Sequence, residues 1–360
     1  MSTAPLLSYI VLSYNYEHYI NSTIRSILDQ TVQDFEIVVV DDCSRDNSVR
    51  VVRSFGDPRI RILQNENNMG GAASYNRAVE AARGKWLVNL DADDWIASDK
   101  AEIQLAAVEK DPSLDVIGTY VAFFDQDGGP HEAAQQLEGT VNQQHELNRV
   151  DTWIGANHLC RSSTMVRRDA HLRIGLDDAT MVRAPDYELW TRALREGCKF
   201  AIVPERLTSI RLHSSGVTHA DPLGSLLEMT YAMLRNLIPL AEQRAFHPSI
   251  ARIITWVCRH HELSRLLPEQ GYRLIGLVME PLVYKDFASF KAAVFNVGER
   301  AELAAIGRRC LSLFSPGAGP YQEISRLHKD IEAYLEARDY WRAESEKWQV
   351  AFLQATGAAK

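Results

Sequence analysis

The chain has 360 residues, of which 46% are hydrophobic and 24% charged, a balance typical of a globular protein and not of a disordered one. Its formal net charge is -8 and no stretch is densely basic. This argues against nucleic acid as a partner and against membrane attachment through a polybasic segment. The five cysteines are scattered without a Cys-x-x-Cys pair, so we expect neither a disulfide framework nor a structural zinc site.

The N-terminus lacks the features of a signal peptide, and no apolar run approaches the roughly 20 residues that a transmembrane helix needs. We therefore expect a cytoplasmic protein without a transmembrane segment. A position peripheral to the inner face of the cytoplasmic membrane, held there by partners, is compatible with this expectation.

The N-terminal part of the chain alternates short apolar runs with amphipathic stretches. The runs predict strands at Tyr9–Leu12, Phe35–Val40, Ile60–Leu63 and Trp86–Leu90. The first run is continuously apolar, as expected for a strand buried on both faces. The stretches between and after them predict helices, at 21–28, 48–55, 71–82, 98–109 and 186–196. A further strand is expected at 116–124, whereas 130–149 is polar and predicts little regular structure. This order favours an α/β fold with a mainly parallel sheet and helices on both faces.

The character of the chain changes after about His219, where strand-like runs give way to helical patterns. We expect three parts: an α/β domain at 1–219, a helical region at 220–315 and a long amphipathic or coiled-coil helix at 321–355. The last part has apolar residues at heptad spacing, which could join two copies of the chain or dock another protein. An amphipathic helix packed on its own domain explains the same pattern equally well.

The acidic run Asp91-Ala92-Asp93-Asp94 directly follows a predicted buried strand. In parallel sheets, ligands bind at the carboxyl ends of the strands, where these carboxylates would lie. Asp91 and Asp93 can both reach one hard cation, and Mg²⁺ and Mn²⁺ prefer such oxygen ligands and share them with phosphates. The alternative is that this acidic run forms a solvated turn. Because the run directly follows a predicted buried strand, we favour a metal site.

Two other segments follow predicted strands. Asp41 and Asp42 could accept hydrogen bonds from a nucleobase or ribose, or could cap the next helix. The segment from Asn65 to Gly71 precedes a helix, where glycines allow a phosphate to approach the backbone. A simple turn explains this second segment equally well.

Taken in order, these motifs resemble the inverting family-2 glycosyltransferases of the GT-A fold. The resemblance runs from about Pro5 to His219. Five motifs carry it. They are the opening strand with its S/T-Y-N turn (8–15), the segment that ends at Thr31 (26–31), the segment that ends in the paired aspartates (36–42), an Asn-x-Gly turn (68–70) and the D-x-D acids (91–93). The resemblance implies a metal-assisted transfer of sugar from a nucleotide-sugar, with a UDP-sugar as the favoured donor, to a saccharide or lipid-linked glycan acceptor.

The resemblance also implies roles for individual residues. Asp186, in a segment similar to the family's E-D-x-D-L-W motif, would be the general base. The Mn²⁺ or Mg²⁺ ligands would be Asp93, Asp91 and His213. The donor-binding residues would be Ser13, Asn15, Asp42, Asn68, Gly70, Asp91 and Arg211, with Asp42 on the nucleobase and Arg211 on a phosphate oxygen.

Two departures from the family pattern stand out. The chain has Ser74-Tyr75-Asn76 where Ala-Arg-Asn is common, so a basic residue near the donor is missing. Pro185 replaces the Glu that often precedes the base. An alternative hypothesis is a glycosyltransferase-like scaffold subunit of a polysaccharide-assembly complex that acts through its C-terminal helix, although the intact acids argue against lost catalysis. A nucleotidyltransferase would share the fold and the metal, but fits the segments at Asp186 and at Arg211 to His213 less well.

Overall fold

The computed structural model describes residues 4–213, 221–243, 247–279 and 284–295 of the chain. Among these residues, eight strands form a single sheet: β1 (Leu7–Ser13), β2 (Phe35–Asp41), β3 (Ile60–Gln64), β4 (Trp86–Asp91), β5 (Trp95–Ile96), β6 (Val116–Phe124), β7 (Met165–Arg167) and β8 (Phe200–Arg211). Their spatial order is β3-β2-β1-β4-β7-β6-β8-β5. Strands β1 to β4 are parallel, as are β6 and β8, whereas β7 is antiparallel to both its neighbours. The predicted α/β fold with a mainly parallel sheet is confirmed.

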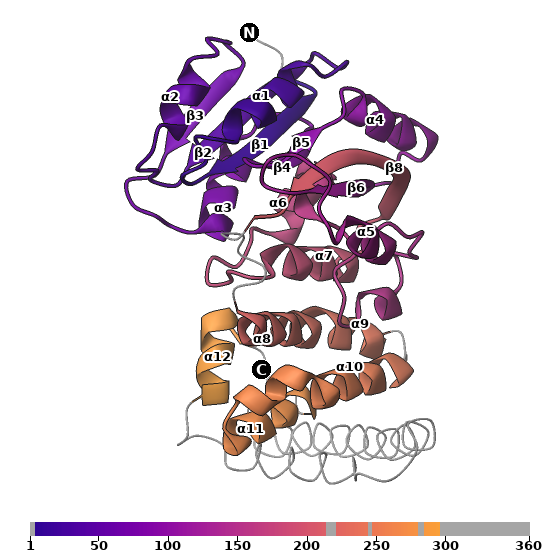
Figure 1. Ribbon diagram of the computed structural model, residues 1–360. Coiled ribbons are helices and arrows are strands. Elements are labelled where there is room, and N and C mark those ends of the chain that lie inside the picture. The colour runs from indigo at the N-terminus through magenta and orange to yellow at the C-terminus, as the bar shows by residue number, and fades with distance from the viewer. Residues whose placement is uncertain (1–3, 214–220, 244–246, 280–283, 296–360) are drawn as a thin grey trace, which may run out of the picture. The chain divides into compact units, whose positions relative to one another are not determined.

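Helices connect and cover these strands (Figure 1). In the part of the chain that carries the sheet they are α1 (Ile20–Leu28), α2 (Ser48–Arg53), α3 (Gly71–Ala81), α4 (Lys100–Lys110), α5 (Ala134–Val141), α6 (Arg168–Ile174) and α7 (Pro185–Arg195). The expected absence of regular structure at 130–149 is wrong for its central part, which forms α5. This helix buries none of its residues fully, so its sequence lacks the apolar face that would have predicted it.

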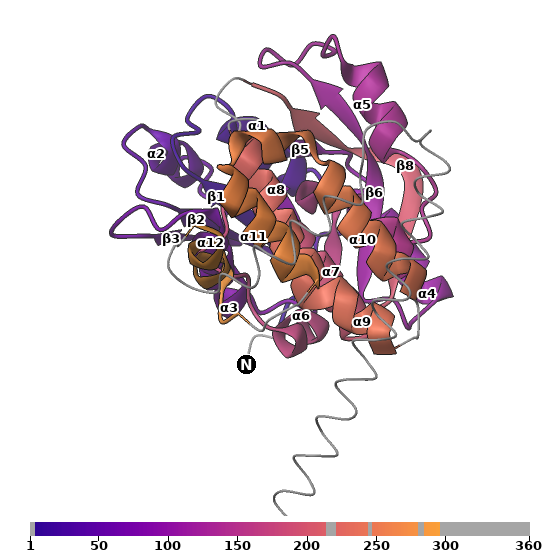
Figure 2. The same cartoon turned by 90° about the horizontal axis from the view of Figure 1, so that it is seen from below.

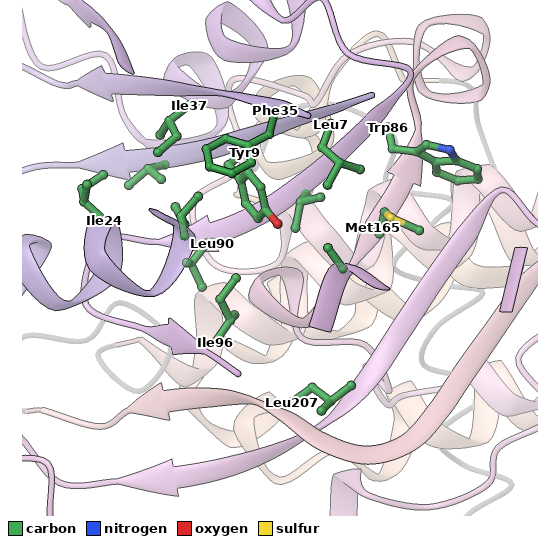
Figure 3. Close-up of a cluster of buried hydrophobic side chains, with 14 of the residues drawn as sticks. Leu7, Tyr9, Ile24, Phe35, Ile37, Trp86, Leu90, Ile96, Met165 and Leu207 are labelled. Carbon is green, nitrogen blue, oxygen red and sulfur yellow. The ribbon is translucent and has the colours of Figure 1, made fainter. Parts of the chain in front are cut away.

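The core explains why the first strands form where they do. Alternate residues of β1, Leu7, Tyr9 and Val11, face one side of the sheet and pack with apolar residues of α1, β2 and β4 (Figure 3). On α1, Ile20, Ile24 and Ile27 recur at helical spacing and are all fully buried. Each such side chain contributes roughly 1.5–3 kcal/mol by leaving water. Helix α3 contacts β1 and β2, which are buried on both faces.

The remaining described residues are helical. They form α8 (Pro222–Ala232), a π-helical turn (Met233–Leu237), α9 (Ile238–Gln243), α10 (His247–Arg259), α11 (Pro268–Met279) and α12 (Phe287–Phe295). The described residues divide into two compact units, and the chain passes from the first to the second after Leu237 and again after Ala292. Within the second unit, α10 contacts both α9 and α11 (Figure 2). No described helix combines the length and apolarity required to cross a bilayer. The helix expected at 321–355 lies outside the described residues.

Candidate functional site

The paired aspartates and the D-x-D acids lie along one edge of the sheet. Strand β1 runs between β2 and β4, and its residue Ser13 lies opposite Asp41 while Leu12 lies opposite Asp91. Neighbouring strands are about 4.8 Å apart, so the backbones at Asp41 and Asp91 are roughly 10 Å apart. Two acidic segments that are 50 residues apart in sequence therefore share the carboxyl edge, where parallel sheets bind ligands.

Asp93 and His213 are in contact although 120 positions, including strands β5 to β8, separate them in sequence. Nε2 of His213 is 2.8 Å from Oδ2 of Asp93. The imidazole stacks on the ring of Tyr19 at 5.7 Å between centroids and lies edge-on to Tyr16. The hydrogen bond to Asp93 raises the pKa of His213 above its ordinary value. Two of the three residues predicted to bind metal are thus in direct contact.

The donor atoms at this point fit a hard or borderline divalent cation. Asp93 offers a carboxylate oxygen and His213 an imidazole nitrogen, and the charge of Asp93 is close enough to Asp91 to raise its pKa. Mn²⁺ and Mg²⁺ accept such a partial set when phosphate and water oxygens complete the coordination. Among the described residues, no three His, Cys, Asp or Glu side chains are arranged as a complete protein site. The geometry therefore suits a cation shared with a ligand.

Arg211 holds the acidic loop in place. Its backbone N–H donates to Oδ1 of Asp94 at 2.9 Å, and its Nε donates to the carbonyl of Asp93 at 3.0 Å. Nη1 donates to the carbonyl of Gln126 at 2.7 Å, and the guanidinium lies 4.8 Å from the rings of both Tyr19 and Trp95. Much of its donor capacity is therefore used within the protein, and its contact with a phosphate oxygen stays a prediction.

Asp42 organises the turn before α3. One carboxylate oxygen accepts from Nδ2 of Asn65 at 2.7 Å and from the backbone N–H of Met69 at 2.8 Å. The other accepts from the backbone N–H of Gly70 at 2.9 Å. Gly70 has a φ of +84°, a conformation that favours glycine. Both oxygens of the Asp42 carboxylate therefore already accept hydrogen bonds from groups of the protein.

The other predicted donor-binding residues differ in their surroundings. Oγ of Ser13 and Oδ1 of Asp41 are both buried and find no hydrogen-bond partner within the described part of the chain. Asn15, with φ of +60°, accepts from the backbone N–H of Arg45 at 2.8 Å and so fastens the segment after β2. Asn68 is exposed.

Asp186 begins α7 and is half-buried. Its Oδ2 accepts from Nδ2 of Asn157 at 2.9 Å, and its Oδ1 accepts from the backbone N–H of Tyr187 at 2.8 Å. Burial raises the pKa of Asp186, and the Arg161 guanidinium opposes the rise. The charge of Asp186 in turn raises the pKa of Asp91, so the two carboxylates share one electrostatic environment.

Several other groups respond to the same charges. Desolvation and the charge of Asp93 raise the pKa of Asp91 to about 6, although its side chain remains open to solvent. Burial raises the pKa of the Cys160 thiol, and the charges of Asp94, Asp91 and Asp186 raise it further. Cys160 therefore lies among carboxylates that come from β4 and α7.

The structure thus brings Asp91, Asp93, Asp186 and His213 to one region, with Asp42 along the same edge of the sheet. Their individual chemical roles remain predictions. The sequence analysis missed the residues that hold these groups in place, among them Tyr16, Tyr19, Asn157, Arg161 and Ser162. The two tyrosines directly follow the S/T-Y-N turn, which could have signalled them. The other three lie in an irregular segment without a periodic pattern.

Comparisons with known proteins identify the family of the chain. Residues 8–175 match the family described as Glycosyl transferase family 2. An uncharacterized glycosyltransferase of Methanocaldococcus jannaschii is 30% identical over 212 residues, which cover 58% of this chain and 71% of the relative. The Escherichia coli UDP-Glc:alpha-D-GlcNAc-diphosphoundecaprenol beta-1,3-glucosyltransferase WfgD is 41% identical over 116 residues, 32% of this chain and 46% of that protein.

Solved structures support the same fold. TarS of S. aureus (residues 1–349), solved in complex with UDP, aligns with a TM-score of 0.56 at 17% identity over 86% of this chain and 90% of that chain. The mannosyltransferase PcManGT of Pyrobaculum calidifontis, solved with GDP-Man and Mn²⁺, aligns with a TM-score of 0.52 at 16% identity over 86% of this chain and 88% of that chain. With its family-2 motifs, its relatives and its GT-A-type α/β fold, the chain belongs to glycosyltransferase family 2 and is a glycosyltransferase.

Proposed function

We propose that this glycosyltransferase moves a sugar from a nucleoside diphosphate sugar to a hydroxyl of a saccharide or lipid-linked glycan, with inversion at the anomeric carbon. The observation that carries the proposal is the shared environment of Asp186, Asp91 and the Asp93–His213 pair. A base on one side and a cation site on the other would flank the bond that breaks.

Mn²⁺ or Mg²⁺ would bind through Asp93 and His213, with Asp91 beside them. When bound, the cation would neutralise the diphosphate and make it a better leaving group. The Mn²⁺ in the PcManGT complex supports this use of metal. The UDP in the TarS complex and the UDP-Glc in the name of WfgD favour UDP as the nucleotide, whereas PcManGT was solved with a GDP-sugar. The diphosphoundecaprenol in the name of WfgD supports a lipid-linked acceptor.

Asp186 would act as the general base. Its carboxylate takes the proton of the acceptor hydroxyl as that oxygen bonds to the anomeric carbon, and the bond from this carbon to the phosphate oxygen breaks. The nucleoside diphosphate leaves with the bonding electrons. One displacement without a covalent enzyme intermediate inverts the configuration. Burial raises the pKa of Asp186 above the ordinary aspartate value, which makes its carboxylate a stronger base.

The test is a panel of UDP- and GDP-sugars incubated with the full chain and Mn²⁺ or Mg²⁺, with and without saccharide and lipid-linked acceptors. We expect nucleoside diphosphate as product, and NMR of the new linkage should show the anomer opposite to that of the donor. Release of pyrophosphate would instead identify a nucleotidyltransferase. Retention of configuration would overturn the single-displacement mechanism, and turnover unaffected by EDTA would overturn metal assistance.

A further inference from the structure

Tyr75 stands where the family resemblance leads one to expect a basic residue, and the structure holds a guanidinium directly over its ring. The Arg161 guanidinium carbon lies 4.1 Å from the ring centroid. The hydroxyl of Tyr75 donates to Oδ1 of Asn89 at 3.0 Å, which fixes the ring beside β4. His171 stacks on the same ring at 5.6 Å. Burial lowers the pKa of His171 to about 4, so Arg161 is the charged member of this stack.

The turn that carries Arg161 is fastened to the end of β4. The backbone N–H of Asp91 donates to Oγ of Ser162 at 3.0 Å. One step back along β4, Asn89 bonds Thr164 twice, through its backbone N–H to the Thr164 carbonyl at 3.1 Å and through Nδ2 to Oγ1 at 2.9 Å. The position of Arg161 is therefore set relative to the first D-x-D acid.

The charge of Arg161 acts on both sides of the proposed reaction centre. Its neighbour Ser162 accepts from the backbone N–H of Asp91, and its charge opposes the rise that burial causes in the pKa of Asp186, so Arg161 lies near both residues. Nη2 of Arg161 pairs with Oδ2 of Asp177 at 2.7 Å, and the Asp177 side chain is fully buried, whereas that of Arg161 keeps 12% of its surface. A guanidinium has five N–H donors in a planar fork, so pairing with Asp177 through Nη2 leaves donors for an anion.

An anionic ligand needs fixed positive charge here. The region contains Asp91, Asp93, Asp94 and Asp186, and a donor diphosphate would add further negative charge. A divalent cation beside Asp93 balances only part of this. Arg161, stacked on Tyr75 of α3, provides a further fixed positive charge in this region.

We propose that Arg161 binds the diphosphate of the donor and replaces the basic side chain that is missing at position 75. The inference rests on the proposed use of a nucleoside diphosphate sugar. The ring of Tyr75 orients the planar guanidinium of Arg161, and the carboxylate of Asp177 pairs with Nη2 of that guanidinium. We assign Arg161 to the phosphates and not to the nucleoside because Ser162, the next residue in the chain, accepts from the backbone N–H of Asp91 at the D-x-D edge.

The test compares binding of UDP and of uridine, in parallel with GDP and guanosine, to the full chain in Mn²⁺. Calorimetry measures the diphosphates and ligand-observed NMR the nucleosides. Arg161→Gln is expected to weaken diphosphate binding at least tenfold and to leave nucleoside binding unchanged, since charge-assisted contacts to phosphate are the strong ones. Arg161→Lys, which keeps the charge but loses the planar fork, should fall between Arg161→Gln and the unmodified chain.

Arg167 offers a matched control. It also lies over an aromatic ring, Trp86 at 4.5 Å, and pairs with a carboxylate, Asp115 at 3.1 Å, but it belongs to β7 and not to the site. Arg167→Gln should leave diphosphate affinity unchanged. Equal diphosphate binding by Arg161→Gln and the unmodified chain would overturn the inference, as would an equal loss for diphosphate and nucleoside.

Two further outcomes are informative. Should Arg161→Gln fail to fold by thermal unfolding, the comparison is made with Arg161→Lys, and equal loss of both ligands would again overturn the inference. Failure of the unmodified chain to bind either diphosphate would count against the proposed donor class itself, and so is distinct from a failure at Arg161.

Discussion

The variant Asp186→Asn tests whether Asp186 acts as the catalytic base or only stabilises the start of α7. The carboxylate accepts one hydrogen bond from Asn157 and one from the backbone N–H of Tyr187. In the variant, the oxygen of the asparagine amide still accepts from one of these two donors, while its NH₂ group faces the other donor and cannot accept from it. The loss of about one hydrogen bond costs roughly 0.5–1.5 kcal/mol of the free energy of unfolding, which is small against the 5–15 kcal/mol typical of native proteins.

The effect on turnover is expected to be much larger. General-base catalysis contributes about 10²–10⁴-fold, equivalent to roughly 2.7–5.4 kcal/mol of the activation free energy. Asp186→Asn should therefore lose turnover by this factor while its affinity for the nucleoside diphosphate stays within about threefold, because a base acts on the acceptor hydroxyl. The assays are nucleoside diphosphate release with the donor and acceptor identified above and calorimetry with the diphosphate alone.

Asp221 provides the matched control for a purely structural role. It begins α8, where its Oδ1 accepts from the backbone N–H of Gly224 at 2.9 Å. Asp221→Asn makes the same chemical change at another helix start and should leave turnover nearly unchanged. Full activity in Asp186→Asn would refute its assignment as the base, and equal losses in the two variants would show that helix initiation explains the effect.

Three other perturbations test the site and the fold. Removing divalent metal with EDTA should weaken nucleoside diphosphate binding, and Asp93→Asn should weaken it even in excess Mn²⁺; calorimetry giving metal-independent affinity would contradict the cation site. Gly84→Ala would place a Cβ 2.5 Å from the backbone nitrogen of Ser8, so urea unfolding should show a loss of about 1–3 kcal/mol, whereas Gly139→Ala has open space and should not destabilise the chain. Burial alone would raise the pKa of Glu36, but hydrogen bonds from its arginine and serine neighbours lower it below 4.5. Glu36 therefore stabilises the fold above about pH 4.5 and loses this contribution as the pH falls through its lowered pKa, so the stability gap between the unmodified chain and Glu36→Gln should narrow in acid; a gap independent of pH would contradict this.

Strands β1, β2 and β4 could be predicted because they are mainly apolar and almost wholly buried, which leaves little choice of structure. Strand β3, at the edge of the sheet, is only partly buried and was predicted from its short apolar run alone. Strand β8 was not predicted. Its middle residues Pro204, Glu205 and Arg206 are exposed, and a register shift against β6 interrupts the alternation that marks a strand. Its formation depends on β6, which lies far away in the sequence.

Asp42, Asp91 and Asp93 were singled out from sequence because they stand at or directly after the ends of strands whose carboxyl ends meet, whereas Asp186 was assigned through the family resemblance alone. What surrounds them was not found. Arg161 comes to lie over Tyr75 only because helix α3 and the turn that contains Ser162 are both hydrogen-bonded to β4, and no local pattern encodes such a contact. For the same reason Arg211 and Asn15 were predicted as ligand contacts, while the structure also gives both of them hydrogen bonds that position loops.

The hydrogen bonds of Asp42 have a consequence for affinity. Its carboxylate already holds Asn65, Met69 and Gly70 before any nucleotide arrives. Immobilising a flexible side chain on binding costs roughly 0.5–1.5 kcal/mol, and a pre-organised turn avoids that cost for each group it has ordered in advance. The nucleotide end of the donor would then meet a rigid surface, and changes in shape on binding would be confined to other parts of the pocket.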